Sequence, residues 1–140
     1  LEGLAKNNLK PDSKLIIQCT QNDSANKKII KKILLRKNRP DALFASVERL
    51  ALIAYQVCNE MNFAIPEDIK IIGFSNLPTA SMLKPSLSTI TQPAYQMGRE
   101  AASILFKMIE KRGNNIILER TVIKSELIER ESTSNIKRKK

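Results

Sequence analysis

The chain has 140 residues, of which 42% are hydrophobic and only 4% aromatic. This length allows one domain with a buried core, and the composition is typical of an aliphatic α/β core rather than of an aromatic surface for stacking bases. Nowhere does the sequence approach the roughly 20 apolar residues of a transmembrane helix, and no signal peptide opens it, so we expect a cytoplasmic protein.

The net charge of +10 is unevenly distributed. Residues 1–40 hold ten Lys or Arg against three Asp or Glu, residues 41–90 hold three against five, and residues 91–140 hold eleven against six. A basic balance favours a nucleic-acid partner. The basic residues of the first segment, however, alternate with apolar ones as on the solvent face of an amphipathic helix, without an aromatic neighbour, so direct nucleic-acid contact is the less favoured interpretation: Lys27, Lys28, Lys31 and Lys32.

The first segment predicts the order helix, strand, helix. Residues 1–9 resemble the last turns of a helix with no capping residue before it, so we expect that the chain has been cut there. Residues 15–19 form a short apolar run that predicts a strand. A helix to about residue 36 follows three favourable N-cap residues, namely Asn22, Asp23 and Ser24.

A strand, a helix and a second strand come next. Residues 42–45 are a short apolar run, apolar residues at helical spacing predict a helix from about 49 to 61, and residues 69–72 are typical of a strand buried on both faces. A parallel pair with a right-handed crossover explains this order most simply. Ser75 and Asn76 follow the second strand directly, at the sheet edge where α/β proteins bind ligands.

The last third predicts a loop, a strand, a helix and an extended end. Residues 77–86 form a loop with exposed apolar side chains, which often mark a partner surface, and residues 87–91 form a short strand. The helix from 94 to 111 has the strongest apolar stripe, and residues 116–131 are extended. From Ser132 onward the sequence is polar and basic, which predicts a frayed tail.

Several kinds of chemistry are absent from the sequence. It contains no histidine, which excludes imidazole acid–base catalysis and His-bearing metal sites within this chain. The four glycines are too far apart for a phosphate-binding loop, and Cys19 and Cys58 are best explained as reduced core thiols. Asp41 and Glu48 are the one conceivable carboxylate pair, but Asp41 after Pro40 is typical of a turn. We therefore expect neither an enzyme nor a cofactor or metal.

Four blocks of sequence, in this order and at this spacing, resemble the effector-binding region of LacI/GalR-type transcriptional regulators. They are residues 39–45, residues 65–74, residues 85–93 with Met97-Gly98, and residues 126–132. The resemblance implies an α/β fold like that of periplasmic sugar-binding proteins, in which helices flank a parallel sheet and a small ligand is clamped between two subdomains. Regulators of this family bind operator DNA through an N-terminal helix-turn-helix, which is absent from this chain.

The resemblance further implies a carboxyl-terminal piece that carries mainly the second subdomain. Residues 1–132 would belong to the effector-binding domain and residues 133–140 would form a basic flexible tail. The helix 94–111 would belong to the first subdomain, so its apolar stripe must find another partner. We expect that it either mediates self-association or packs differently from its counterpart in an intact regulator.

The family's ligand contacts carry over only where positions match. Where the family usually has Asn-Asp after the first strand, this chain has Val47-Glu48, and where it has an acidic residue after Gly-Phe, this chain has Ser75. Gln92 matches a position that faces the cleft in sugar-responsive members. The expected effector contacts are therefore Ser46, Val47, Glu48, Ser75, Asn76 and Gln92. Because two acidic positions differ, the effector is left open between a sugar, a modified or acidic sugar and another ligand.

The family also implies a homodimer and a mechanism. Its dimer surface uses the helix after the Asn-Asp position and the loop before the short strand, so the expected contacts are Arg49, Ile53, Met82 and Leu83. An effector that closes the cleft would favour one orientation of the subdomains, and the dimer would pass this bias to the DNA-binding heads. A sugar-binding protein of a transport system is the main alternative, and a sugar-processing enzyme on a similar sheet is the second. The sequence gives neither the effector nor the operator, and does not distinguish an inducer from a co-repressor.

Overall fold

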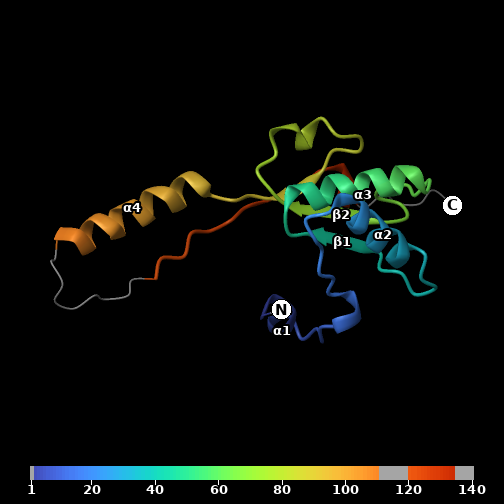
Figure 1. Ribbon diagram of the computed structural model, residues 1–140, viewed down its shortest axis with the longest axis horizontal. Coiled ribbons are helices and arrows are strands. Elements are labelled where there is room, and N and C mark those ends of the chain that lie inside the picture. The colour runs from blue at the N-terminus through green and yellow to red at the C-terminus, as the bar shows by residue number, and fades with distance from the viewer. Residues whose placement is uncertain (1, 111–119, 135–140) are drawn as a thin grey trace.

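The computed structural model describes residues 2–110 and 120–134 of the chain. Four strands form one sheet, and a long helix extends away from the body that contains it (Figure 1). The helices are α1 (Glu2–Lys6), α2 (Asp23–Leu34), α3 (Glu48–Glu60) and α4 (Ala94–Glu110). The strands are β1 (Ala42–Ala45), β2 (Lys70–Phe74), β3 (Ser88–Ile90) and β4 (Leu127–Ile128).

The sheet has the strand order β1-β2-β3-β4. β1 pairs with β2 in parallel, with Leu43 opposite Ile71, and β2 pairs with β3 in parallel, with Gly73 opposite Thr89. The short strand β4 runs antiparallel to β3. The predicted parallel pair with a helical crossover is therefore present, since α3 connects β1 to β2.

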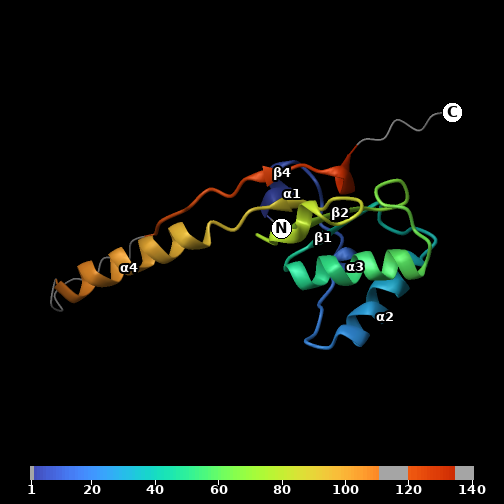
Figure 2. The ribbon, with the colours of Figure 1, turned by 90° about the horizontal axis from the view of Figure 1, so that it is seen from above.

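Helices α2 and α3 lie on one side of the sheet (Figure 2). The core between them contains Leu34, Val57, Ile69 and Ile71, each at most 2% exposed. Gly73 of β2 lies against the first turn of α3, where a Cβ built on it would make an ordinary van der Waals contact with the Ala51 side chain at 3.4 Å. This contact brings the first turn of α3 to the carboxyl end of β2.

The opposite face of the sheet is less covered than predicted. Ile72 is only half-buried and Phe44 is 61% exposed, so the central strands are fully buried on one face alone. The expectation of strands buried on both faces is therefore wrong for this chain.

Residues 15–19 do not form the predicted strand. Ser13–Leu15 is a turn of 3₁₀ helix, and residues 16–20 are irregular. Side chains bind the ends of this segment instead: Arg36 donates to the carbonyl of Lys14, and Asn26 bonds both the N–H and the C=O of Thr20. An apolar groove of about 510 Å³ consequently separates the segment from β1.

The carboxyl end is more ordered than predicted as far as residue 134. Residues 131–133 form a 3₁₀ turn in which Ser132 is completely buried. Its hydroxyl donates to the carbonyl of Ile71 at 2.6 Å and accepts from the amide of Ser88 at 2.8 Å. Ser132 thus ties the turn at residues 131–133 to β2 and β3. The prediction of a tail that is frayed from Ser132 onward was wrong. Residues 135–140, like the extended residues expected at 116–119, lie outside the described part.

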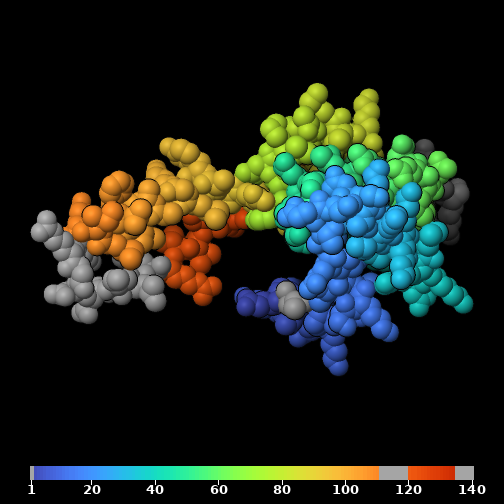
Figure 3. Space-filling view, viewed as in Figure 1, coloured from blue at the N-terminus to red at the C-terminus, as the bar shows by residue number. Residues whose placement is uncertain are grey.

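Helix α4 confirms the predicted helix but has no packing partner among the described residues. None of its residues is buried, and Leu105 and Phe106 are 55% and 63% exposed. The space-filling view shows it standing clear of the body, with the segment that returns to the sheet, residues 120–126, beside it (Figure 3). That segment rejoins the sheet where Thr91 N donates to Glu126 O at 2.8 Å and Glu126 N donates to Thr91 Oγ1 at 2.9 Å. Across the described ranges, no helix is long and apolar enough to cross a membrane.

Candidate functional site at the carboxyl edge of the sheet

Polar side chains from three elements meet where β1, β2 and β3 end. Glu48 begins α3 directly after β1, Ser75 and Asn76 follow β2, and Gln92 follows β3. Since the three strands are parallel, their carboxyl ends share one edge of the sheet. The structure therefore brings together four of the six predicted effector contacts.

Ser75 is buried and positions the Glu48 carboxylate through a hydrogen bond. Its side chain is 2% exposed, and its hydroxyl accepts from the amide of Leu77 at 2.8 Å while donating to Glu48 Oε2 at 2.8 Å. A serine hydroxyl has one proton, so the donated bond is committed to the carboxylate. Ser75 thus positions Glu48 and has little surface of its own for a ligand.

Asn76 and Gln92 join the ends of β2 and β3. The Asn76 side-chain amide donates to the backbone carbonyl of Gln92 and accepts from its backbone N–H. The Gln92 side chain in turn donates to the carbonyl of Phe74 at 3.1 Å. Asn76 thus uses its amide oxygen and one of its two N–H groups on the backbone of Gln92, whereas the amide oxygen of Gln92 has no donor among the described residues.

Ser46 and Val47 lie on the same edge and are both exposed. Val47 occupies the N-cap position of α3 but cannot accept a capping hydrogen bond, and it is 48% exposed. The first turn of α3 also carries Glu48, whose carboxylate suits the positive end of the helix dipole.

The sequence did not identify the arginine that braces this edge. Arg49 donates to the carbonyls of Thr20 and Gln21 at 3.1 and 3.2 Å and lies 3.4 Å from the Asp23 carboxylate. It was expected at a dimer surface because of its place on the helix. Nothing in the local sequence signals these contacts, since they join residues more than 25 positions apart.

The other expected dimer residues lie in different environments. Ile53 is 3% exposed and belongs to the core, so its side chain has no surface to offer a partner. Leu83 is half-buried and packs against the core, whereas Met82 is 74% exposed. Of the four, Met82 alone presents a large apolar surface to solvent.

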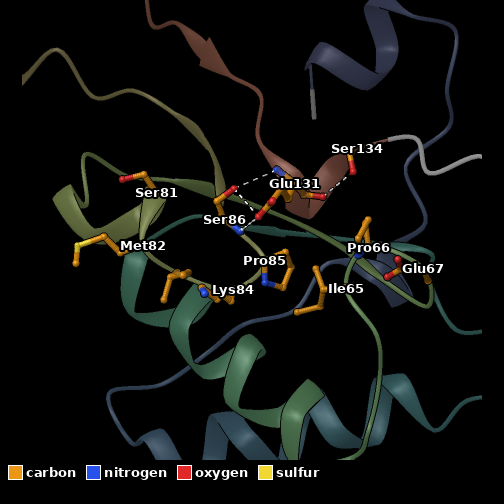
Figure 4. Close-up of a pocket in the computed structure, with 11 residues that line it drawn as sticks. Ile65, Pro66, Glu67, Ser81, Met82, Lys84, Pro85, Ser86, Glu131 and Ser134 are labelled. Carbon is orange, nitrogen blue, oxygen red and sulfur yellow. Dashed lines mark hydrogen bonds between the residues drawn. The ribbon is translucent and has the colours of Figure 1, made fainter.

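Two of the hollows in the described structure lie at opposite ends of the strands. A shallow one of about 370 Å³ adjoins Asn76 and Gln92 and is lined further by Tyr95, Lys124 and Glu126. The other, of about 690 Å³, lies at the opposite edge, before β2 and β3 (Figure 4). There the Glu131 carboxylate accepts from Ser86 N and Oγ at 2.7 and 3.0 Å, which lowers the pKa of Glu131.

The second hollow has a structural explanation. The Ser86–Glu131 bonds tie the loop before β3 to the 3₁₀ turn near the carboxyl end, and Ser132 N donates to Ser86 O at 2.9 Å beside them. Within residues 2–110 and 120–134, no group of acidic or cysteine side chains has the arrangement of a metal site. At the carboxyl edge, in contrast, Glu48 Oε1 and Gln92 Oε1 have no donor among the described residues.

Comparison with known proteins agrees with this geometry. The family model of the periplasmic binding protein-like domain matches residues 2–133. The HTH-type transcriptional regulator MalR of Clostridium butyricum is 30% identical over 135 residues, which are 96% of this chain but 39% of MalR.

Solved structures give the same assignment. A LacI-family transcriptional regulator from Sanguibacter keddieii DSM 10542 superposes with a TM-score of 0.80 at 29% identity, covering 96% of this chain and 50% of that one. The transcriptional regulator CelR in complex with cellobiose gives 0.78 at 26% identity, covering 94% of this chain and 39% of that one. The chain thus spans about half or less of each of these proteins.

Proposed function

The chain belongs to the periplasmic binding protein-like domains of LacI-type transcriptional regulators, and we propose that it binds a small, sugar-like effector at the carboxyl edge of its sheet. One observation carries the proposal: Glu48 and Gln92 arrive from separate elements and are each fixed within one residue of the end of β2. Glu48 is exposed, and no donor among the described residues reaches Glu48 Oε1 or Gln92 Oε1. The cellobiose bound to CelR supports a sugar as the class of ligand.

Effector binding would act on the connection to α4. Gln92 lies one residue before Pro93 and two before the first residue of α4, and Asn76 anchors its backbone to the end of β2. A ligand held by Gln92 therefore touches the segment through which the sheet is joined to α4. In the full-length regulator, this coupling would favour one arrangement of the two subdomains, as linkage requires.

The proposed regulator also forms a homodimer and binds operator DNA through a helix-turn-helix outside this chain. Met82 supports the dimer, because a 74% exposed methionine on the loop before β3 is a typical interface side chain. Leu83 would contribute its exposed part and Arg49 its outer surface, while Ile53 is left out of the interface because it lies in the core. The name of MalR as an HTH-type regulator supports the DNA partner.

A thermal-shift screen of the full-length protein against sugars, sugar acids and sugar phosphates tests the proposed site. A ligand at one hundred times its dissociation constant stabilises the protein by about 2.7 kcal/mol. Gln92→Ala should weaken binding of the active compound at least tenfold, because it removes one acceptor and loosens the end of β2. Gln56→Ala, an exposed change on α3, is the matched control. Equal affinity of both variants would refute the site.

A further inference from the structure

We infer that Arg49 is a positioning residue of the proposed effector site. It holds the loop of residues 20–23 against the first turn of α3, so that the loop forms a fixed border of the carboxyl edge beyond β1. The link to an effector rests on the proposed function, whereas the hold on the loop can be measured without any ligand.

The segment that leads into this loop has little packing of its own. No side chain of residues 15–20 is buried, and residues 17–19 make no backbone–backbone hydrogen bond within the described ranges. Toward β1 the segment faces the apolar groove of about 510 Å³. The position of the loop therefore depends on the polar contacts that begin at residue 20.

Both neighbouring helices bond the carbonyl oxygen of Thr20. Asn26 of α2 donates to it at 2.9 Å and Arg49 Nη2 of α3 donates to it at 3.1 Å, so both lone pairs of this oxygen are used. Arg49 Nη1 donates to the Gln21 carbonyl at 3.2 Å, and Nε lies 3.4 Å from the Asp23 carboxylate. One guanidinium thus contacts three of the four loop residues, which a lysine with its single nitrogen could not do.

The contacts from the two helices differ in kind. Asn26 is 0% exposed and also accepts from Thr20 N at 2.8 Å, so it belongs to the folded body. The Arg49 side chain is 45% exposed, and Thr20 is exposed as well, so water can replace the guanidinium at the Thr20 carbonyl. Loss of Arg49 should therefore release the loop from α3 with little change in overall stability.

The place of the loop makes this hold relevant to an effector. Arg49 directly follows Glu48, one of the two side chains proposed to bind the ligand, in the first turn of α3. Residues 20–23 consequently border the carboxyl edge at the residue next to Glu48. A ligand on Glu48 would meet a fixed border only while Arg49 is bonded to the loop, because a released loop widens the site on this side.

Cys19 measures the position of the loop in the full-length protein. It precedes Thr20, is partly exposed and lines the groove, whereas Cys58 is only 1% exposed. Arg49→Met should raise the rate at which N-ethylmaleimide modifies Cys19 at least threefold, with an unfolding midpoint close to that of the wild type. Peptide mass spectrometry assigns the modification to one cysteine or the other.

Two further variants isolate the bonds to the carbonyls. Arg49→Lys keeps the positive charge beside Asp23 but has one nitrogen, so Cys19 should react about as fast as in Arg49→Met. Lys27→Met removes another contact between α2 and α3, the pair with Glu60 at 3.0 Å, and should leave Cys19 at the wild-type rate. A wild-type rate for either Arg49 variant, or the same increase for Lys27→Met, overturns the inference.

Isothermal titration calorimetry on the same full-length proteins tests the link to the effector. Cellobiose, glucose and glucose 6-phosphate are the titrants. A titrant that binds should bind Arg49→Met at least fivefold more weakly than the wild type, and Lys27→Met equally well. Unchanged affinity for Arg49→Met overturns the inference while the proposed site stands. A loss of affinity that appears only with loss of the dimer in light scattering also overturns it, because Arg49 would then act through the dimer interface.

Failure of the proposed function has a different signature. No binding by any titrant, or equal affinity of Gln92→Ala and the wild type, overturns the proposed site and with it the role of Arg49 in that site. The Cys19 rates still decide whether Arg49 holds the loop.

Discussion

Helices α3 and α4 are both amphipathic, yet they differ completely in what they bury. α3 buries five residues against the sheet and α2, including Ala51, Val57 and Cys58, whereas α4 buries none. Two parallel strands lie beneath α3, while α4 leaves the sheet at residue 94 and meets no second layer in the described chain. An apolar stripe therefore predicts a helix and the face it needs to bury, but the partner of that face has to come from elsewhere.

The largest effect should come from the same substitution made on both helices. Ile53 on α3 is 3% exposed and Ile109 on α4 is 62% exposed. Ile53→Ala leaves a cavity in the core and should lower the free energy of unfolding by about 3 kcal/mol, whereas Ile109→Ala should change it by less than about 0.5 kcal/mol. Urea denaturation followed by circular dichroism measures both.

A large loss of unfolding free energy for Ile109→Ala would contradict this difference between α3 and α4. It would mean that α4 is packed in solution, most simply against a second copy of the chain. Light scattering at two protein concentrations distinguishes this result from a monomer, and so tests the expected self-association of the helix.

The second effect concerns the turn that closes the body. Ser132→Ala removes the bonds to Ile71 O and Ser88 N in a site with no access to water, which should cost about 2 kcal/mol. Ser134→Ala removes an exposed bond to Glu131 O and serves as the control. Indistinguishable unfolding midpoints for the two variants would contradict the role assigned to Ser132.

A smaller effect should appear above pH 9. Burial raises the pKa of Tyr55 from 10.0 to about 12 and that of Cys58 from 9.0 to about 11, because the charged forms are poorly solvated there. The folded state therefore resists deprotonation, and its stability should fall as the pH rises from about 9 to about 12. Tyr55→Phe should reduce this alkaline loss by about 1 kcal/mol, allowing for partial exposure. Tyr95→Phe on α4, where the side chain is 83% exposed, should leave the loss intact in the same pH series of urea melts.

The smallest effect belongs to the ion pairs between α2 and α3. Hydrogen bonds from Lys31 and Lys27 lower the pKa of Glu60, so its contribution is present at neutral pH and is lost as the pH falls below 4.5. Glu60→Gln should slightly flatten the stability profile between pH 5 and pH 3, and added salt should weaken the wild-type contribution. An unchanged acid limb in thermal melts would show that these pairs contribute nothing.

Local sequence signals predicted the elements whose partners follow within a few dozen residues. β1 was predicted at its observed residues 42–45, and α3 within one residue of Glu48–Glu60, because an apolar strand and an apolar helix stripe here pack on each other. The strand predicted at residues 15–19 is absent because the Asn26 and Arg36 side chains bond to the backbone at the ends of this segment, in place of a neighbouring strand. The prediction of a frayed tail from Ser132 was wrong because a polar residue in a polar stretch does not indicate that its hydroxyl will be buried against two strands.

The candidate site was predictable as a place and less so as a set of contacts. The polar residues that end each strand predicted which side chains would meet at one edge of the sheet. Their division into Ser75 and Asn76, which are occupied with protein groups, and Glu48 and Gln92, which keep free oxygens, depends on hydrogen bonds across 16 to 27 positions. Such pairings follow from the register of the strands and not from residue type.

The hydrogen bonds between Thr91 and Glu126 join β3 to a segment that is synthesised much later, which affects folding during translation. β4 and the Ser132 turn are synthesised after α4, yet β4 pairs with β3 and Ser132 bonds to β2. During translation, β3 therefore remains an unpaired edge strand until residue 132 has left the ribosome. The entropy of closing so long a loop rises only slowly with its length, so natural insertions within that loop would be tolerated far better than the loss of the final three residues of the Ser132 turn.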